Sequence, residues 1–162
     1  GHTIDNLYVC DSTGSYNNDF LGPVKITTMT PNAVGDAAEW DGSAGGDHYT
    51  YVDDFPLAND DADYVESDVT GEKELWHYTD PGDVGNTIHA VQVVTRARAT
   101  DASCRDMKAL AKSGGGYESE GSVLTVGVEY TELTRIMERQ PGGTDAWTAA
   151  ALNSCQFGVK VG

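Results

Sequence analysis

The sequence predicts an all-β protein, an antiparallel β-sandwich of the jelly-roll type with an extended N-terminal β arm. Short stretches in which apolar and polar residues alternate follow one another along the chain, separated by turns rich in Gly, Pro and Asp. This pattern is typical of sandwiches, in which each strand buries one face. The 19 glycines and a hydrophobic fraction of 39% also favour short strands and many turns over packed helices.

Residues 1–31 are predicted to form the arm. Two stretches alternate, residues 3–10 (TIDNLYVC) and residues 23–31 (PVKITTMTP), on either side of a turn-rich segment. Because two strands alone are at best marginally stable in water, we expect the arm to pack against a neighbouring subunit or a preceding domain. The predicted partner interface consists of Ile4, Leu7, Tyr8, Val9, Val24 and Ile26.

The rest of the chain is divided into a linker and a sandwich domain. Residues 32–48 are rich in Gly, Ala and Asp, which predicts a linker or long surface loop. Residues 49–162 are predicted to form the sandwich. Alternating patterns there predict strands at residues 62–69, 72–80, 88–98, 103–115, 122–133, 134–143 and 155–161.

One of these strands is ambiguous from sequence alone. A helix over residues 103–115 would bring Met107, Leu110 and Ala111 together, whereas a strand would let alternate residues share a face. A strand is favoured because the stretch is short and ends in three glycines.

The C-terminal segment predicts a short helix followed by a strand. Residues 144–154 indicate one or two helical turns, with Thr144 or Asp145 as the N-cap. The final strand would present one apolar face, made of Cys155, Phe157, Val159 and Val161.

The charge balance excludes some classes of partner. The chain has 26 acidic and 10 basic residues, a net charge of −16. A polyanion repels phosphate groups, so we expect no direct nucleic-acid binding and no binding to anionic membranes. No apolar run approaches the roughly 18 residues of a membrane span. The few cations cluster in part, and ordinary surface ion pairs explain them better than pairing with a neighbour: Arg96, Arg98, Arg105 and Lys108.

Three cysteines lie far apart, with no CxxC pair. Three is a poor number for a disulfide framework, so Cys10, Cys104 and Cys155 are interpreted as small buried residues. A single bridge between Cys104 and Cys155 is the alternative.

An aspartate-rich stretch, residues 53–63 (DDFPLANDDAD), raises the question of a calcium site. Calcium prefers six to eight oxygen ligands in a flexible loop, yet the glycine and closing glutamate of an EF-hand loop are missing. We therefore expect a solvated acidic turn and no cofactor, because Asp and Asn favour tight turns. The calcium alternative would use Asp53, Asp54, Asp60, Asp61 and Asp63, together with Asn59.

No catalytic constellation stands out, so the protein is not expected to be an enzyme. There is no GxSxG motif, and no motif accompanies the histidines. Among 26 acidic residues some pair always fits a glycosidase on paper, so spacing selects none. Carbohydrate binding is the alternative function, because sandwiches often stack sugar rings on exposed aromatic residues. The candidates for that role are Trp40, Tyr49 and Tyr51, with Trp40 expected to be exposed in a polar loop.

Several segments resemble a module of tailed-phage and prophage virion proteins, in which a β-sandwich follows a lamininG/concanavalin-like domain. The resemblance covers nearly the whole chain, and its motifs are structural. The final segment, a Trp-Thr followed by a Gly-Val strand, carries it best. The segments are IDNLYVCDSTGSYNNDFLG (4–22), HYTYVDD (48–54), DADYVES (61–67), IHAVQVVTRARATDA (88–102), KSGGG (112–116) and AWTAAALNSCQFGVKV (146–161).

The resemblance implies a virion location and a structural role, in capsid decoration, a head fibre or a tail-associated component. It implies no enzymatic activity. The expected partners are other virion proteins and further copies of the chain, with a trimer as one candidate state. One departure matters, because the preceding sandwich is absent here. Residues 1–31 would then be an orphaned edge, a linking arm or a cleavage product.

Overall fold

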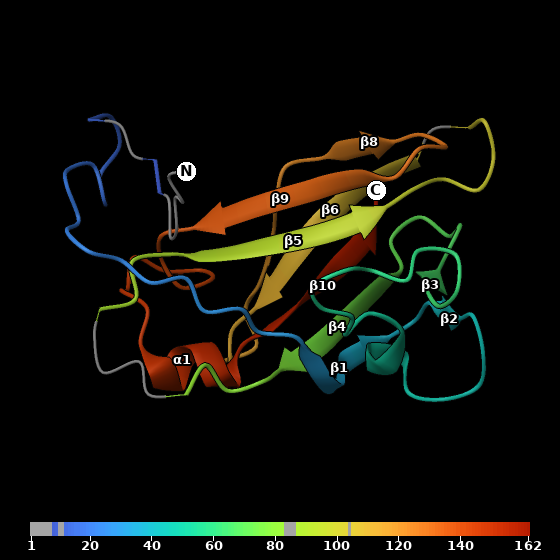
Figure 1. Ribbon diagram of the computed structural model, residues 1–162, viewed down its shortest axis with the longest axis horizontal. Helices are drawn as coiled ribbons and strands as arrows, with labels where there is room; N and C mark the ends of the chain where they lie inside the picture. The colour runs from blue at the N-terminus through green and yellow to red at the C-terminus, as the bar shows by residue number, and fades with distance from the viewer. Residues whose placement is uncertain (1–7, 10–11, 83–86, 104) are drawn as a thin grey trace, which may run out of the picture.

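A computed structural model of the chain describes residues 8–9, 12–82, 87–103 and 105–162. It confirms an all-β, sandwich-like fold. The described residues form ten strands, a 3-10 turn and one short α-helix (Figure 1). In chain order these are β1 (Pro31–Ala38), β2 (Asp41–Gly42), η1 (His48–Tyr51), β3 (Val65–Glu66), β4 (Lys73–Tyr78), β5 (Val91–Ala97), β6 (Arg105–Lys112), β7 (Glu118–Glu120), β8 (Leu124–Val126), β9 (Thr131–Met137), α1 (Ala149–Ser154) and β10 (Gln156–Val161).

The strands form two layers of unequal width. The wide layer is a six-stranded antiparallel sheet with the order β1-β4-β10-β6-β7, in which β8 also pairs with β6. The narrow layer is the antiparallel pair β5–β9, which crosses in front of the wide sheet in Figure 1. A separate two-stranded ribbon, β2–β3, lies at one end of the molecule. The second layer therefore has two strands facing a sheet of six.

The core lies between β5–β9 and the β10–β6 side of the wide sheet. Val93 of β5 and Met137 of β9 belong to one buried cluster with Ala111 and Phe157. Burial of such side chains contributes about 25 cal/mol for each Å² of apolar surface removed from water. The predicted apolar face of the last strand is confirmed, because all four of its residues are buried: Cys155, Phe157, Val159 and Val161.

The opposite face of the wide sheet is closed by lysine side chains. Lys160 lies directly between Lys73 and Lys108 across the strands, so the three share a face. Two residues further along β10, Gly158 lies between Leu75 and Leu110, which are 0% and 1% exposed. The aliphatic stems of lysines cover apolar surface while their ammonium groups stay at the surface. Here the ammonium group of Lys73 pairs with Glu118, and those of Lys108 and Lys160 pair with Glu120.

The linker prediction is wrong over its first part. Residues 31–38 form β1, which pairs with β4 at the edge of the wide sheet. The reason is steric, because β1 passes so close to β4 that a Cβ at Gly35 would overlap the carbonyl group of Leu75. Small residues are therefore required at a site where the sequence pattern indicates a loop.

Three further boundaries differ from the expected ones. The stretch 122–133 is two strands rather than one, because the chain turns after β8 and continues as β9 in the other layer. β9 then ends at Met137, well before the predicted break at Pro141. The short helix is capped by Thr148, whose hydroxyl accepts a hydrogen bond from the Ala151 amide, so Thr144 and Asp145 lie outside it.

The cysteine predictions are covered only in part. Cys155 is buried and its thiol is free, in keeping with the buried role expected for it. Burial raises the pKa of this thiol. Cys10 and Cys104 lie outside the described residues.

Candidate functional site

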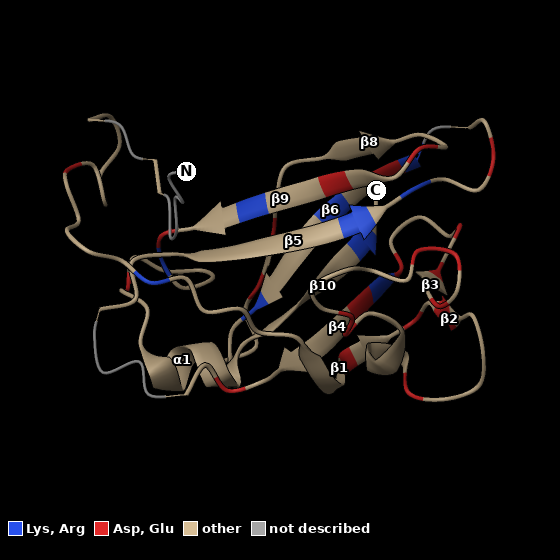
Figure 2. Ribbon diagram, viewed as in Figure 1, with Lys and Arg blue, Asp and Glu red and all other residues tan. Residues whose placement is uncertain are grey.

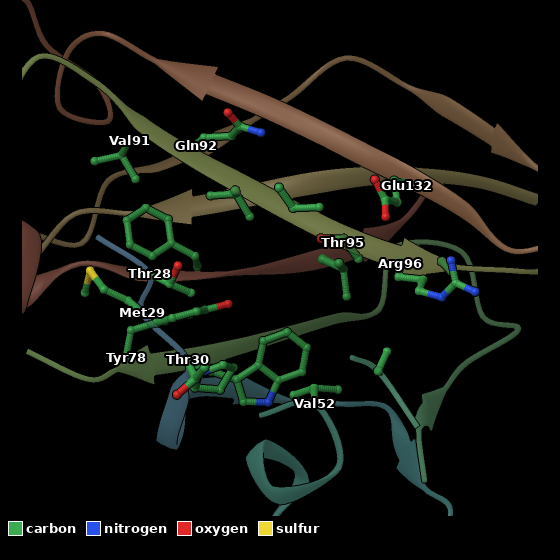
Figure 3. A pocket seen from close by; sticks show the side chains of 18 of the residues that line it. Thr28, Met29, Thr30, Val52, Tyr78, Val91, Gln92, Thr95, Arg96 and Glu132 are labelled. Carbon is green, nitrogen blue, oxygen red and sulfur yellow. The ribbon is translucent and has the colours of Figure 1, made fainter. Parts of the chain in front are cut away.

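The narrow second layer leaves a cleft beside β5. It has a volume of about 2470 Å³, several times the roughly 300–1,000 Å³ of pockets that enclose small ligands. Figure 3 shows β5 residues Val91 and Thr95 on one side and Tyr78 and Val52 on the other. The floor is the inner face of the wide sheet, formed by Trp76, Tyr78, Phe157, Val159 and Val161.

One edge of β5 is unpaired. Within the part of the chain that the structure describes, β5 pairs only with β9, through all seven of its residues. An edge of this kind presents a row of unpaired amide and carbonyl groups, on which another strand can add. The side chains of β5 alternate between its two faces, since Val93 is buried while Val94 is 53% exposed. The cleft therefore combines a free backbone edge with an apolar floor.

The N-terminal segment closes only one end of this cleft. The Thr30 amide donates to the Thr79 hydroxyl, and the Thr79 amide donates to the Thr30 carbonyl. Met29 packs against the core cluster beside Tyr78 and Val91. Figure 3 shows Thr28, Met29 and Thr30 at the Val91 end of the cleft, away from Thr95 and Arg96.

A second attachment of the arm lies near the same end. The Asn17 side-chain amide donates to the carbonyl oxygen of His89 and to the carboxylate of Glu138. The guanidinium of Arg139 lies 3.6 Å from the centre of the Tyr16 ring. Residues 12–30 therefore contact their own domain at two places, whereas the expected arm depends on another polypeptide.

The predicted partner-interface residues are spread along this arm. Ile4 and Leu7 lie outside the described residues. The Tyr8 hydroxyl accepts a hydrogen bond from the Leu21 amide, and Val9 is 89% exposed. Val24 is partly buried, whereas Ile26 is 62% exposed. Residues 23–28 line the cleft but form no strand, contrary to the predicted alternating strand.

The aspartate-rich loop 53–63 forms another wall and is attached to the far end of β5. Arg96 pairs with Asp60 at 2.6 Å, and Arg98 pairs with Asp61 at 2.8 Å. The Tyr130 hydroxyl donates to Asp61, and both guanidinium groups lie over its ring at 4.6 and 5.3 Å. Figure 2 shows these acidic loops close to the basic end of β5.

These contacts stabilise the ionised carboxylates. The hydrogen bond from Arg96 lowers the pKa of Asp60, and hydrogen bonds from Tyr130 and Arg98 lower the pKa of Asp61. Two of the five candidate calcium ligands are thus bound to arginine. Asp54 accepts hydrogen bonds from Asn59 instead. In the described ranges no group of three or more His, Cys, Asp or Glu residues could hold a metal ion.

One of the three candidate sugar-binding residues, Trp40, is buried. Trp40 is 9% exposed and packs with Trp76 in a buried cluster, so the expectation of an exposed Trp40 is wrong. The cause is a contact distant in sequence: the Trp40 amide donates to Glu74, whose other oxygen lies 2.8 Å from Nδ1 of His48. Tyr49 packs against the same cluster, and Tyr51 lines the cleft.

Unpaired polar atoms concentrate at the cleft. Four buried side-chain atoms in the described part of the chain lack a hydrogen-bond partner, and three belong to cleft-lining residues: Trp40 Nε1, Trp76 Nε1 and Asp63 Oδ1. Buried polar groups are normally satisfied, and leaving one unpaired costs about 1–3 kcal/mol. Sequence reasoning did not find this cleft, because alternation predicts strands but not which edge stays unpaired.

Comparison of the chain with protein-family models, with curated proteins and with solved structures finds no match in any of the three. Over the residues that the structure describes, no helix is both long and apolar enough to cross a membrane.

Proposed function

We propose that the chain is a non-enzymatic structural subunit of a phage virion and that it acts by packing against other subunits. One observation carries the proposal: the second layer is incomplete, so that β5 keeps an unpaired edge above the apolar floor of a cleft of about 2470 Å³. The virion context rests on the resemblance of residues 4–22 and 48–161 to phage surface proteins.

The size and lining of the cleft favour a polypeptide occupant. Its volume exceeds what one small ligand fills, and a free strand edge offers the backbone hydrogen bonds used in strand addition. The net charge of −16 suits a protein displayed in many copies, because like charge keeps separate molecules soluble.

Two measurements test the proposal. Sedimentation velocity over a wide concentration range should show self-association of the purified chain into one closed oligomer. Mass spectrometry of particles purified from a culture of the source organism should find this chain in the particle fraction, in proportion to the major capsid protein. A chain that is monomeric at every concentration and absent from the particles would contradict the proposal.

A further inference from the structure

The unpaired edge of β5 and the exposed part of the arm complement each other. We propose that residues 23–28 of one chain add as a strand to β5 of a second copy and cover its cleft. This inference rests on the proposed function, since it names the surface and the partner through which the subunits would pack.

The length of the arm segment matches the edge. Residues 23–28 in extended conformation span about 20 Å, close to the length of the seven-residue β5. In a strand, Val24, Ile26 and Thr28 would share one face. That face would meet the apolar floor at Tyr78, and Ile26 would lose the exposure it has in the single chain.

Charge also favours this occupant. Lys25 is the one lysine that makes no ion pair with any described residue, whereas the other four are paired with carboxylates. The wall that faces β5 is acidic and includes cleft-lining residues to which no Lys or Arg of the described chain is bound: Asp54, Asp63, Glu66 and Asp68. A strand that carries one lysine would bring a cation to this wall.

The chain's own arm is held where it does not cover its own β5. Its two attachments, Asn17 to His89 and Met29 beside Val91, both lie at the same end of the strand. No described strand other than β9 pairs with β5, so its edge stays open at Thr95 and Arg96. A second copy can bring the same residues along the whole edge without this restraint.

The first test uses one arm variant with a matched control. Ile26→Asp places a charge on the face that would be buried, and we expect self-association to weaken by roughly tenfold or more in sedimentation velocity. Val128→Asp makes a similar change at a residue that is 50% exposed and does not line the cleft, so its self-association should equal that of the parent. Far-UV circular dichroism checks that both variants stay folded.

The second test identifies the donor chain directly. Equal amounts of ¹⁴N- and ¹⁵N-labelled protein are mixed, unfolded, refolded together and treated with a carbodiimide, which joins amines to nearby carboxylates. We expect Lys25 peptides of one isotope to be linked to peptides containing Asp54, Asp63 or Glu66 of the other. Lys25→Arg should abolish these links while leaving the oligomer intact.

The outcomes separate this inference from the proposed function. An oligomer that forms equally well with Ile26→Asp, or Lys25 links found only within one isotope, would overturn strand donation and leave subunit packing standing. A chain that remains monomeric at all concentrations would overturn both.

Discussion

Arg96 Nε lies 2.6 Å from Oδ1 of Asp60, and this contact ties the end of β5 to the aspartate-rich loop. The neighbouring pair of Arg98 and Asp61 repeats the connection, with Tyr130 beneath both guanidinium groups. The loop thus forms part of the cleft wall. Its position should depend on these arginines, because loop 53–63 has few buried side chains of its own.

The first prediction concerns that attachment. The double variant Arg96→Gln/Arg98→Gln should exchange the amide hydrogens of residues 53–63 several-fold faster in hydrogen–deuterium exchange mass spectrometry, with the unfolding transition almost unchanged. Arg105→Gln is the control, because Arg105 pairs with Asp101 away from this loop. Equal exchange in the two variants would show that other contacts hold the loop.

The pH dependence of the same loop follows from its carboxylates. Their folded-state pKa values lie below the ordinary aspartate value of 3.8, so the pairing is fully present above that pH and is lost as the pH falls through the lowered values. The rate of amide hydrogen exchange in residues 53–63, corrected for the pH dependence of exchange in an unstructured chain, should therefore stay constant from pH 7 to about pH 4. It should rise only below about pH 4. A change near neutral pH would point to a different titrating group.

Glu120 carries the third prediction, on the outer face of the wide sheet. Hydrogen bonds from Lys108 and Lys160, each 2.6 Å long, lower its pKa from 4.5 to about 2. The stabilisation is present above pH 4.5 and disappears as the pH falls towards 2. Glu120→Gln should lower the free energy of unfolding at pH 7 by no more than about 1 kcal/mol, since the pairs are near the surface.

Urea unfolding at several pH values checks the Glu120 prediction. The difference between the variant and the parent should shrink below pH 4.5 and vanish near pH 2. Glu129→Gln is a useful control because it changes a carboxylate outside this lysine cluster. A difference that persists unchanged at pH 2 would show that Glu120 acts through packing instead of charge.

Strands in which hydrophobicity alternates could be predicted from the sequence. The final strand is the clearest case, because Phe157, Val159 and Val161 alternate with polar residues or glycine and all face the core. β1 could not be predicted in this way, because its alternating residues Ala33, Gly35 and Ala37 are too small to give a clear hydrophobic pattern. The absence of a side chain at Gly35 is required by the close approach to β4, which only the structure reveals.

The candidate site could be predicted only in part. The sequence predicts Ile26 as a partner-interface residue, and in the single chain it is 62% exposed. The burial of Trp40 could not be predicted, because it depends on Glu74, 34 residues away. The unpaired edge of β5 depends on which strands meet, and β5 finds its partner β9 across a long stretch of chain. Local patterns carry no information on such pairings, so the cleft could not be found from sequence.

The close approach in the wide sheet leads to a fourth prediction. A Cβ at Gly158 would overlap the carbonyl oxygen of Glu74, which is part of the sheet backbone and cannot move aside. Gly158→Ala should therefore destabilise the protein by about 3 kcal/mol or more, measured by urea unfolding. Gly127→Ala should be almost neutral, because nothing lies within 4 Å of the added methyl group. Similar losses in both variants would contradict this packing.

The last prediction tests whether the indole N–H group of Trp76 lacks a hydrogen-bond partner at the cleft. Trp76 and Trp147 are 5% and 4% exposed, so replacing either by Phe removes a similar volume from the core. Only Trp147 has a partner, because its Nε1 donates to the Met137 carbonyl at 2.9 Å, whereas Trp76 Nε1 has none in the described chain.

Trp147→Phe should therefore cost about 1–3 kcal/mol more than Trp76→Phe in urea unfolding, because it also removes the buried hydrogen bond from Trp147 Nε1 to the Met137 carbonyl. Trp76→Phe, by contrast, removes an N–H group that is buried without a partner, and this gain in stability offsets part of the stability lost through poorer packing. Equal losses in the free energy of unfolding would mean that Trp76 Nε1 already has a hydrogen-bond acceptor. The cleft would then not offer this unpaired donor to an incoming strand. In the assembled protein, the incoming strand is expected to give Trp76 Nε1 a backbone acceptor. The difference between the two variants should therefore be smaller in the oligomer than in the monomer. A larger difference in the oligomer would contradict strand addition.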